Sequence, residues 1–555
     1  MNRFEYIVEE IDGDYAHLRR TDAGALETGA DGELKLVARA LLPPEIAEGT
    51  RLLYEWMQYS VMNPNKEQEL LQTIDRVIAE GPYKPEWDSL MKAPVPEWFR
   101  EQKLGIFIHW GIYSVPAYAN EWYSRNMYIQ GTPEFEHHIK TYGPHKDFGY
   151  KDFLPMFKAE KFDPKEWISL FKQAGAGYLF PVAEHHDGFQ MYKSEISDWN
   201  AAQMGPKRDV LGDLAREAEN AGLKFCTSSH RAEHWFFMGH GKEFDSDIKD
   251  PMQKGDFYWP AMPEADHQSL FSEPCPTEEY LSDWLARTAE LILNYRPKLL
   301  YFDWWLQHHA FKPYLKRLAA FYYNCGKKWG EDVLICYKHD AMMFGSGIVE
   351  VERGGFADPK PYHWQTDTAV ARNSWCYTDT LDYKSSQEVI FTLIDVVSKN
   401  GNLLLNIGPK SDGSIPEGDK KILTDLGAWM QINKEAILGA KCWRKAQEGP
   451  SKSTEGQFQD QQAAVFTSQD YRFTANHGAI YAIALQCPED GKFMVKALAD
   501  SADQNRPEFH GIISKVEVLG FDGAVKEWHT DKEGLYVETV GVKTEFPVTL
   551  KVIVE

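Results

Sequence analysis

The spacing of hydrophobic and polar positions changes twice along the chain. Near the N-terminus, residues 4–20 alternate polar and apolar side chains around Gly13, which is typical of a half-buried strand pair. From about 95 to 443, short apolar runs alternate with amphipathic segments of helical length, and past Trp443 short alternating segments return. The pattern predicts a small β domain over 1–62, a linker over 63–94, an α/β domain over 95–443 and a C-terminal β-sandwich over 444–555.

The apolar runs of the central region are predicted strands, and helical segments such as 208–222 and 386–400 stand between several of them. The runs are LGIFIHWG (104–111), YLFPVAEHHDG (178–188), KFCTSSH (224–230), KLLYFDWW (298–305), VLICYKH (333–339), IVEVERG (348–354) and NLLLNIGP (402–409). Strands separated by helices of this length favour a parallel sheet with right-handed crossovers. The fold class is therefore α/β, and the number of such units predicts a (β/α)8-like TIM barrel.

Polar residues gather where these predicted strands end, which is where barrel enzymes carry their chemistry. They are His109, Glu184, His185, His186, Asp187, His230, Arg231, Glu233, His234, Asp303, Glu350 and Glu352. A buried polar group is costly unless it is satisfied or functional, and several strands end in this way together. We therefore expect a functional site at the C-terminal ends of the strands.

Two chemistries are compatible with these residues, metal-assisted hydrolysis and glycoside hydrolysis by paired carboxylates. Adjacent histidines such as His185 and His186 project in different directions, His109 has no HxH partner, and the sequence contains no HExxH. We expect no metal and no other cofactor.

Charge and cysteine content limit the binding partners and the cellular compartment that we expect for the protein. The chain carries 60 basic and 83 acidic residues, a net charge of −23, which disfavours nucleic acid and anionic membranes as partners. Its N-terminus has acidic residues where a signal peptide needs an apolar run. The 7 cysteines lie far apart without a CxxC pair, which favours a reducing compartment. We expect a cytoplasmic protein, or a periplasmic or secreted one if a leader was removed.

Between about Pro96 and Trp443 the sequence resembles glycoside hydrolase family 29, the retaining α-L-fucosidases. The resemblance rests on long blocks in the same order, namely EWFREQKLGIFIHWGIYSVPAYANEWYS, FDPKEWISLFKQAGAGYLFPVAEHHDGFQMYKSEISDWN, RPKLLYFD and KNGNLLLNIGPKSDGSIPE. It implies an exo-glycosidase that removes terminal α-L-fucose from fucosylated oligosaccharides or glycosides by double displacement, without a cofactor.

The resemblance also implies roles for single residues. Asp303 stands at the position of the family's nucleophile. Glu352 matches the acid/base glutamate better than Glu350, although residues two apart on a strand point the same way and both are candidates. The residues expected to bind the sugar or wall its pocket are His109, Glu121, Trp122, Tyr123, His185, His186, Trp199, His230 and Tyr301.

This sequence departs from the family's pattern near the expected site. Tyr301 stands where Trp is common, Trp304 where Gly often follows the nucleophile, and Gln365 where a Glu is common; SSHRAEHW (228–235) replaces an aromatic stretch. These differences leave open a related sugar such as α-L-galactose, and they leave linkage and aglycone undefined. A metal-dependent barrel hydrolase and a non-catalytic carbohydrate-binding protein are also compatible with the sequence, and so is a homo-oligomer.

Overall fold

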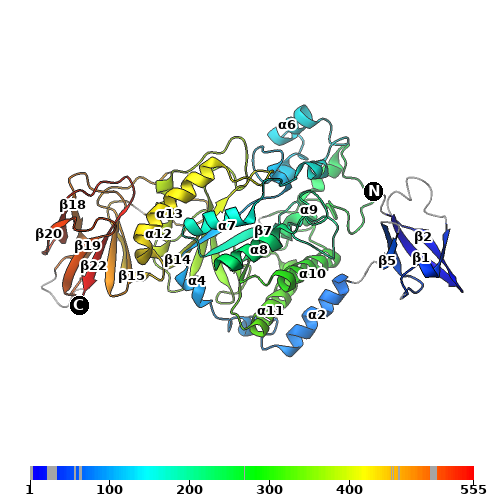
Figure 1. Cartoon of the computed structure of the whole chain (residues 1–555), viewed down its shortest axis with the longest axis horizontal. Coiled ribbons are helices and arrows are strands. Elements are labelled where there is room, and N and C mark those ends of the chain that lie inside the picture. The colour runs from blue at the N-terminus through cyan, green and yellow to red at the C-terminus, as the bar shows by residue number, and fades with distance from the viewer. Residues whose placement is uncertain are drawn as a thin grey trace. The chain divides into compact units, whose positions relative to one another are not determined.

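The computed structural model describes residues 4–21, 34–44, 46–55, 58–61, 66–267, 269–451, 453, 455–460, 463–500 and 509–555. The chain divides into two compact units, Met1–Thr73 and Ile74–Glu555 (Figure 1). In the described part, no helix combines the length and the apolar character needed to cross a bilayer.

The N-terminal unit is built around a five-stranded antiparallel sheet in the order β3-β2-β1-β4-β5. Its strands are β1 (Phe4–Asp12), β2 (Tyr15–Arg20), β3 (Leu34–Ala38), β4 (Arg51–Glu55) and β5 (Gln58–Val61). The predicted hairpin is present, and Gly13 takes a φ of 58° in its turn, a value that glycine adopts without steric cost. Alternate residues of β1 and β2, including Val8 and Leu18, form a small hydrophobic core.

The second unit contains a closed parallel barrel, which confirms the predicted fold class. Its strands are β6 (Leu104–Ile108), β7 (Tyr178–Glu184), β8 (Lys224–Phe225) with its continuation β9 (Thr227–Ser229), β10 (Leu299–Phe302), β11 (Leu334–Tyr337), β12 (Ile348–Glu352), β13 (Trp364–Ala369) and β14 (Gly401–Ile407). The barrel closes because β6 pairs with both β14 and β7. Strand β13 was not among the predicted strands, because WQTDTA has no apolar run.

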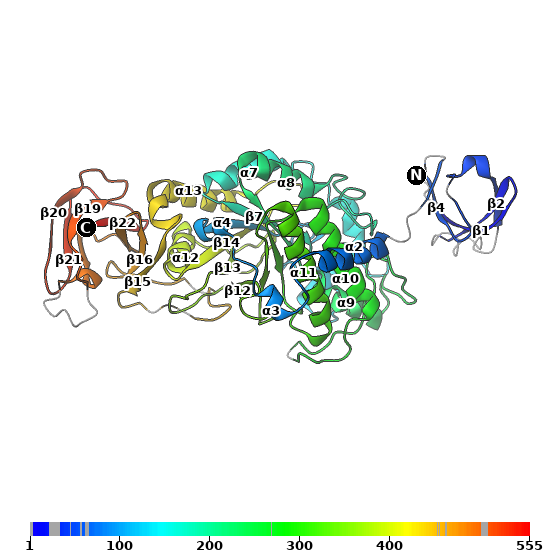
Figure 2. The ribbon, with the colours of Figure 1, turned by 90° about the horizontal axis from the view of Figure 1, so that it is seen from below.

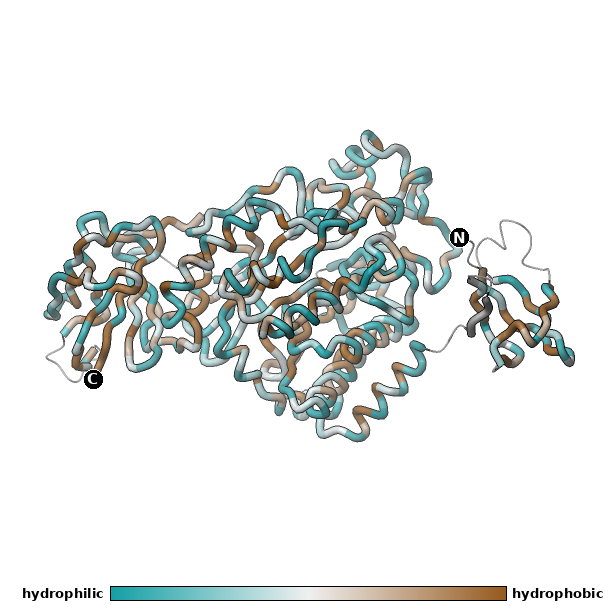
Figure 3. Tube along the Cα trace, in the orientation of Figure 1, coloured by the Kyte–Doolittle hydropathy of each residue, from teal (hydrophilic) through white to brown (hydrophobic). Residues whose placement is uncertain are grey.

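Helices cover part of the barrel (Figures 1 and 2). They are α7 (Pro164–Gln173), α8 (Val210–Ala221), α10 (Glu278–Tyr295), α11 (Lys312–Trp329), α12 (Ser386–Ser398) and α13 (Glu417–Ile437). In Figure 3 hydrophobic and hydrophilic colours alternate along these helices, as expected for one apolar and one polar face. Residues 338–347 and 353–363, all described, join β11 to β12 and β12 to β13 without a helix.

Local sequence fixes where several helices begin. Asp209 accepts a hydrogen bond from the backbone of α8, and Thr277 does the same for α10. Ser385 and Glu388 form a reciprocal capping box at the start of α12. The remaining helices are α2 (Lys66–Glu80), α3 (Trp87–Leu90), α4 (Glu97–Glu101), α5 (Tyr123–Asn126), α6 (Pro133–Tyr142) and α9 (His234–Phe237).

The C-terminal region is built from two antiparallel sheets. One has the order β15-β16-β17-β22-β19 and the other the order β18-β21-β20. The strands are β15 (Lys441–Glu448), β16 (Tyr471–Asn476), β17 (Ala479–Ala484), β18 (Lys492–Val495), β19 (Ile513–Val518), β20 (Val525–Thr530), β21 (Leu535–Thr539) and β22 (Val548–Val554). Residues of both sheets, such as Phe473, Val537 and Leu550, share one hydrophobic core. Helices α12 and α13 lie beside this region, and Arg472 Nε of β16 is 2.6 Å from Asp395 Oδ1 of α12.

A buried ion-pair network holds the strand ends on one side of the barrel. Arg231, which follows β9, lies 2.6 Å from Glu184 at the end of β7 and 2.8 Å from Asp283 of α10. All three side chains are buried, so each charge depends on its partners. Because His185 follows Glu184 and His230 precedes Arg231, the network fixes the backbone from which both histidines project.

We predict that Arg231→Met lowers the free energy of unfolding by about 3–5 kcal/mol, because it leaves the two buried carboxylates to share the guanidinium of Arg287. Guanidinium denaturation followed by tryptophan fluorescence measures the change. Arg216→Met is the matched control, because Arg216 is 60% exposed; we expect it to alter the unfolding free energy by less than about 0.5 kcal/mol. Equal effects of the two substitutions would contradict the structural role of Arg231.

Candidate active site

A cavity of about 400 Å³ opens at the C-terminal ends of the barrel strands. Several strands bring one or two polar side chains to it: His109 follows β6, His185 and His186 follow β7, His230 follows β9, and Asp303 follows β10. Of the residues expected from sequence, those that line the cavity are His109, Glu121, Trp122, His185, His186, His230, Tyr301, Asp303 and Glu352.

Lys338, the residue after β11, lies between the two expected catalytic carboxylates. Its Nζ is 3.1 Å from Asp303 Oδ1, 2.7 Å from Glu352 Oε2 and 3.7 Å from Asp367 Oδ2. The side chain is only 2% exposed. Burial opposes a charge on this amine, but the carboxylates of Asp303, Asp367 and Glu352 raise its pKa well above the ordinary value. Lys338 is therefore a buried, permanently charged ammonium.

Asp303 is held in its ionised form. Its Oδ2 is 2.9 Å from His230 Nδ1 and 3.6 Å from His186 Nε2, and its Oδ1 accepts a 2.9 Å hydrogen bond from the backbone N–H of Trp304. Burial favours the neutral acid, yet Lys338 and the two histidines outweigh it and keep the pKa of Asp303 well below its usual range. An ionised carboxylate at this position is suited to nucleophilic attack.

The pKa of Glu352 is raised, whereas that of Asp303 is lowered. Burial raises the pKa of Glu352 to about 7, the negative charges of Asp367 and Asp303 act in the same direction, and Lys338 opposes them. A carboxyl group that exchanges its proton near neutral pH can serve as both acid and base. Two neighbouring carboxyls with separated pKa values are the pattern from which acid/base and nucleophile roles are assigned.

Glu350 points into the barrel like Glu352, as strand geometry requires, but it is not among the residues that line the cavity. Its Oε1 accepts a 2.6 Å hydrogen bond from Gln365 Nε2, and Gln365 Oε1 accepts one from the Tyr178 hydroxyl. Burial, with the nearby Asp367, raises the pKa of Glu350 well above its ordinary value. Glu350 belongs to a hydrogen-bonded chain inside the barrel.

The four cavity histidines differ in charge. Burial lowers the pKa of His109 and His185 well below the usual value and that of His230 to about 4, so these rings are neutral. Burial opposes protonation of His186 too, but the Glu233 and Asp303 carboxylates raise its pKa to about 9. His186 adds a second positive charge beside Asp303.

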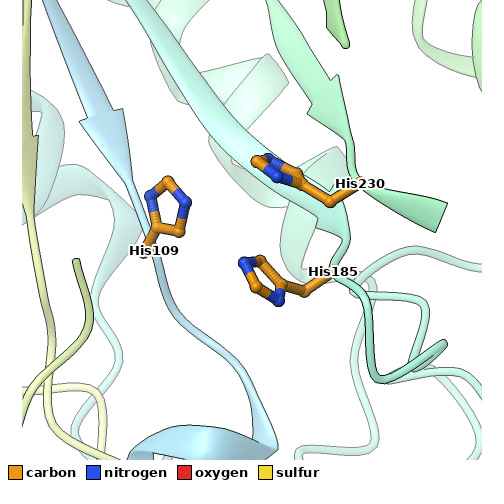
Figure 4. Close-up of side chains that lie close together, drawn as sticks. All are labelled: His109, His185 and His230. Carbon is orange, nitrogen blue, oxygen red and sulfur yellow. The ribbon is translucent and has the colours of Figure 1, made fainter. Parts of the chain in front are cut away.

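Histidines also raise the question of a metal ion. Figure 4 shows His109, His185 and His230 facing one another, and His186, His230 and Asp303 form a second group of possible ligands. Both groups require His230, whose Nδ1 is engaged with Asp303 and whose Nε2 lies 3.0 Å from Ser228 Oγ. The first group then keeps His109, whose Nδ1 is 2.7 Å from Asn406 Oδ1, and His185, which are fewer than the three protein ligands of a catalytic zinc site. The donor set does not fit a resident metal.

Two residues expected in the pocket lie outside it. Tyr123, on α5, is fully buried, and its hydroxyl is 3.0 Å from His138 Nδ1. The indole N–H of Trp199 donates to the carbonyl of Gly255, and its ring packs on Phe257 with centroids 4.9 Å apart. Neither residue is among those that line the cavity, and a contact of either ring with a sugar stays a prediction.

Other cavity residues were not anticipated: Phe107, Asn120, Asn126, Trp304, Lys338, His339, Asp367, Trp375 and Phe458. Lys338 carried a usable signal, because within the predicted strand 333–339 it directly follows the apolar residues LICY, as Asp303 follows LLYF. Asp367 was not identified because strand β13, which contains it, was not predicted. Trp375 and Phe458 lie in segments without periodicity, where the sequence pattern gives no indication of position.

A parallel barrel whose strand ends bring together an ionised and a protonatable carboxyl is the arrangement on which glycoside hydrolases rely. The sequence profile of the α-L-fucosidase family matches residues 70–435, and the chain belongs to this family. It is 29% identical to human tissue α-L-fucosidase over 501 residues, covering 86% of this chain and 94% of the human protein. An α-L-fucosidase of Dictyostelium discoideum is 29% identical over 456 residues, covering 78% and 87%.

Solved structures that are similar to this chain include α-fucosidases. The α-fucosidase of Thermotoga maritima superposes with a TM-score of 0.66 at 29% identity, covering 85% of this chain and all of that one. The structure of that enzyme in complex with fucose gives a TM-score of 0.64 at 30% identity, with the same coverage of this chain.

We predict that protein purified without added metal contains far less than one zinc per chain, because both ring nitrogens of His230 are occupied by Asp303 and Ser228. Elemental analysis after dialysis measures the content. Stoichiometric zinc that is lost on His230→Gln substitution would contradict the prediction and make the histidine group a metal site.

Proposed function

We propose that this protein is a retaining exo-glycosidase that hydrolyses terminal α-L-fucose from fucosylated oligosaccharides, with Asp303 as nucleophile and Glu352 as acid/base. The observation that carries the proposal is the contact of one ammonium with both carboxylates. Since Lys338 Nζ is 3.1 Å from one oxygen and 2.7 Å from the other, these oxygens lie at most the sum of the two distances apart. Oxygens this close suit the roughly 5–5.5 Å between the carboxyl groups of retaining enzymes better than the roughly 6.5–9.5 Å of inverting ones.

The reaction proceeds in two displacements. In the first, a carboxylate oxygen of Asp303 attacks the anomeric carbon while Glu352 gives its proton to the glycosidic oxygen, and the bond to the leaving group breaks. In the second, the Glu352 carboxylate takes a proton from water, which attacks the same carbon. The ester bond to Asp303 breaks, fucose leaves, and Glu352 is protonated again.

The charges of the site change during the two displacements. Ester formation removes the negative charge of Asp303, one of the charges that raise the pKa of Glu352. Glu352 thus holds its proton before the first displacement and releases it more readily afterwards, which suits an acid that becomes a base. These opposite proton affinities favour an enzyme over a non-catalytic binding protein.

Support for fucose comes from the cavity wall and from relatives. Neutral His109 and His185 can donate to and accept from sugar hydroxyls, while Trp122 and Trp375 supply flat apolar surfaces. The Thermotoga maritima enzyme has been solved with fucose bound. An α-L-galactoside differs by one hydroxyl at C6, which an apolar wall rejects weakly. Initial rates on matched aryl α-L-fucoside and α-L-galactoside therefore test the sugar assignment; a faster galactoside would overturn it.

The cellular setting stays a prediction. All seven cysteines are unpaired, which suits the reducing, cytoplasmic location inferred from sequence. A homo-oligomer likewise stays a prediction.

The roles of the three carboxyls predict distinct kinetic phenotypes. Glu352→Ala should slow fucosylated oligosaccharides by about 10²–10⁴-fold, because a poor leaving group must be protonated. It should spare the first step on an aryl fucoside with an acidic phenol and so show a burst. Azide, which needs no base, should restore turnover and give fucosyl azide with the anomeric configuration of the substrate, since two inversions occur.

Asp303→Ala should lose turnover on both substrates, and any azide product should have the opposite configuration, because a single displacement inverts the centre. Glu350→Ala is the matched control and should show neither burst nor azide rescue. Rescue of Glu350→Ala with retained configuration would move the acid/base role by two residues, and rescue of neither glutamate variant would refute this assignment.

The pH dependence follows from the raised pKa of Glu352. Because the first displacement needs the protonated acid, kcat/KM on an oligosaccharide should be highest below pH 7 and fall as pH rises through about 7. Lys338 lowers this pKa, so Lys338→Met should move the alkaline limb to higher pH while reducing kcat/KM. Lys399→Met, which removes another buried lysine outside the cavity, should leave the limb in place. An unmoved limb in Lys338→Met would contradict the coupling.

A further inference from the structure

A short segment of the C-terminal region reaches the active-site cavity. Residues 455–460, here called the strap, belong to the connection between β15 and β16, yet their backbone runs beside the end of β12. Gly456 exchanges two hydrogen bonds with Gly355, of 2.9 and 3.1 Å. The N–H of Phe458 donates to the carbonyl of Glu352 at 2.9 Å. The strap is thus bonded to the acid/base residue itself.

Ion pairs at the end of the strap lock it onto the barrel. Asp460 Oδ2 bonds to Lys384 Nζ and Thr368 Oγ1, and Arg353 Nη1 lies 3.6 Å away. Lys384 and Arg353 are buried, so loss of the Asp460 carboxylate would leave buried positive charges without this partner, which is costly. The position of Phe458 is therefore fixed from both sides.

The backbone conformation of Phe458 is energetically unfavourable. Its φ is 55°, a left-handed conformation that disfavours bulky residues by about 1–2 kcal/mol. Its side chain is 53% exposed, so packing offsets little of that cost. The exposed ring lines the catalytic cavity. A strained backbone position that presents an aromatic ring to an active site motivates a functional interpretation.

The position of Glu352 defines what lies next to Phe458. An acid catalyst must touch the glycosidic oxygen, so the sugar that departs sits beside Glu352. Phe458 is one hydrogen bond from Glu352, and Trp304, also at the cavity, is one hydrogen bond from Asp303. Flat ring faces match the C–H faces of a pyranose.

We propose that Phe458 forms one wall of the aglycone subsite, the place of the pyranose residue to which the fucose is attached, and that Trp304 also borders this subsite. The inference rests on the proposed function, because the role of Glu352 locates the leaving group. It assigns to the C-terminal region a direct part in substrate choice.

The experiment compares two substrates that share fucose but differ in aglycone. One is methyl α-L-fucoside, whose poor leaving group needs the acid but contains no ring, and the other is the fucosyl disaccharide that the wild-type protein cleaves fastest in a linkage panel. Phe458→Ala should lower kcat/KM on the disaccharide by about 10-fold, as expected for loss of one ring contact, and change that on the methyl fucoside by less than about two-fold. Phe458→Trp should retain most of the disaccharide activity.

Phe458→Gly separates the subsite from the stability of the strap. Glycine adopts a φ of 55° without strain, so this variant should have a Tm at least equal to that of the wild type while losing disaccharide activity as Phe458→Ala does. Wild-type disaccharide activity in both variants would overturn the inference. So would equal losses on both substrates, since Phe458 would then only support Glu352. A wild-type protein that cleaves neither substrate would refute the proposed function itself.

Discussion

The contact between the buried Lys338 ammonium and three carboxyls is the interaction on which the rest of the site depends. Asp303, Glu352 and Asp367 come from β10, β12 and β13, and Lys338 follows β11 between them. Two cations, Lys338 and the charged His186, stand beside these three carboxyls, so the carboxyls cannot all ionise without leaving one charge uncompensated. The site meets this constraint by ionising Asp303 and raising the pKa of Glu352 to about 7.

This arrangement also limits how much the protein must rearrange during a reaction. A negative charge moves from Asp303 to Glu352 in the proposed first displacement, and Lys338 already contacts both residues. A fixed charge that serves both states needs no reorientation when the bond breaks, which is the advantage of a preorganised site. The buried network of Arg231 extends the same rigidity to the loops that carry the histidines.

The sequence predicted the barrel well because most of its strands are continuous apolar runs followed by polar residues. Strand β13 escaped because its interior-facing positions include Gln365 and Asp367, which the polar network inside the barrel requires. The pattern of polar residues at predicted strand ends identified Asp303. Glu350 and Glu352 lie two residues apart on one strand, and this pattern could not tell which of them reaches the cavity as the acid/base. Tyr123 has the composition of a pocket residue, and only tertiary packing reveals that it faces α6.

The strap has a consequence for biosynthesis. A nascent chain emerges from the ribosome in order, and the last barrel strand ends at Ile407, well before residue 455. A chain that has just completed its parallel barrel therefore has Asp303, Lys338 and Glu352, but it lacks the Phe458 N–H that donates to the carbonyl of Glu352 and the Phe458 ring beside them. The cavity acquires its final wall only after the segment between β15 and β16 has been made, which ties maturation of the catalytic centre to synthesis of the C-terminal sheets.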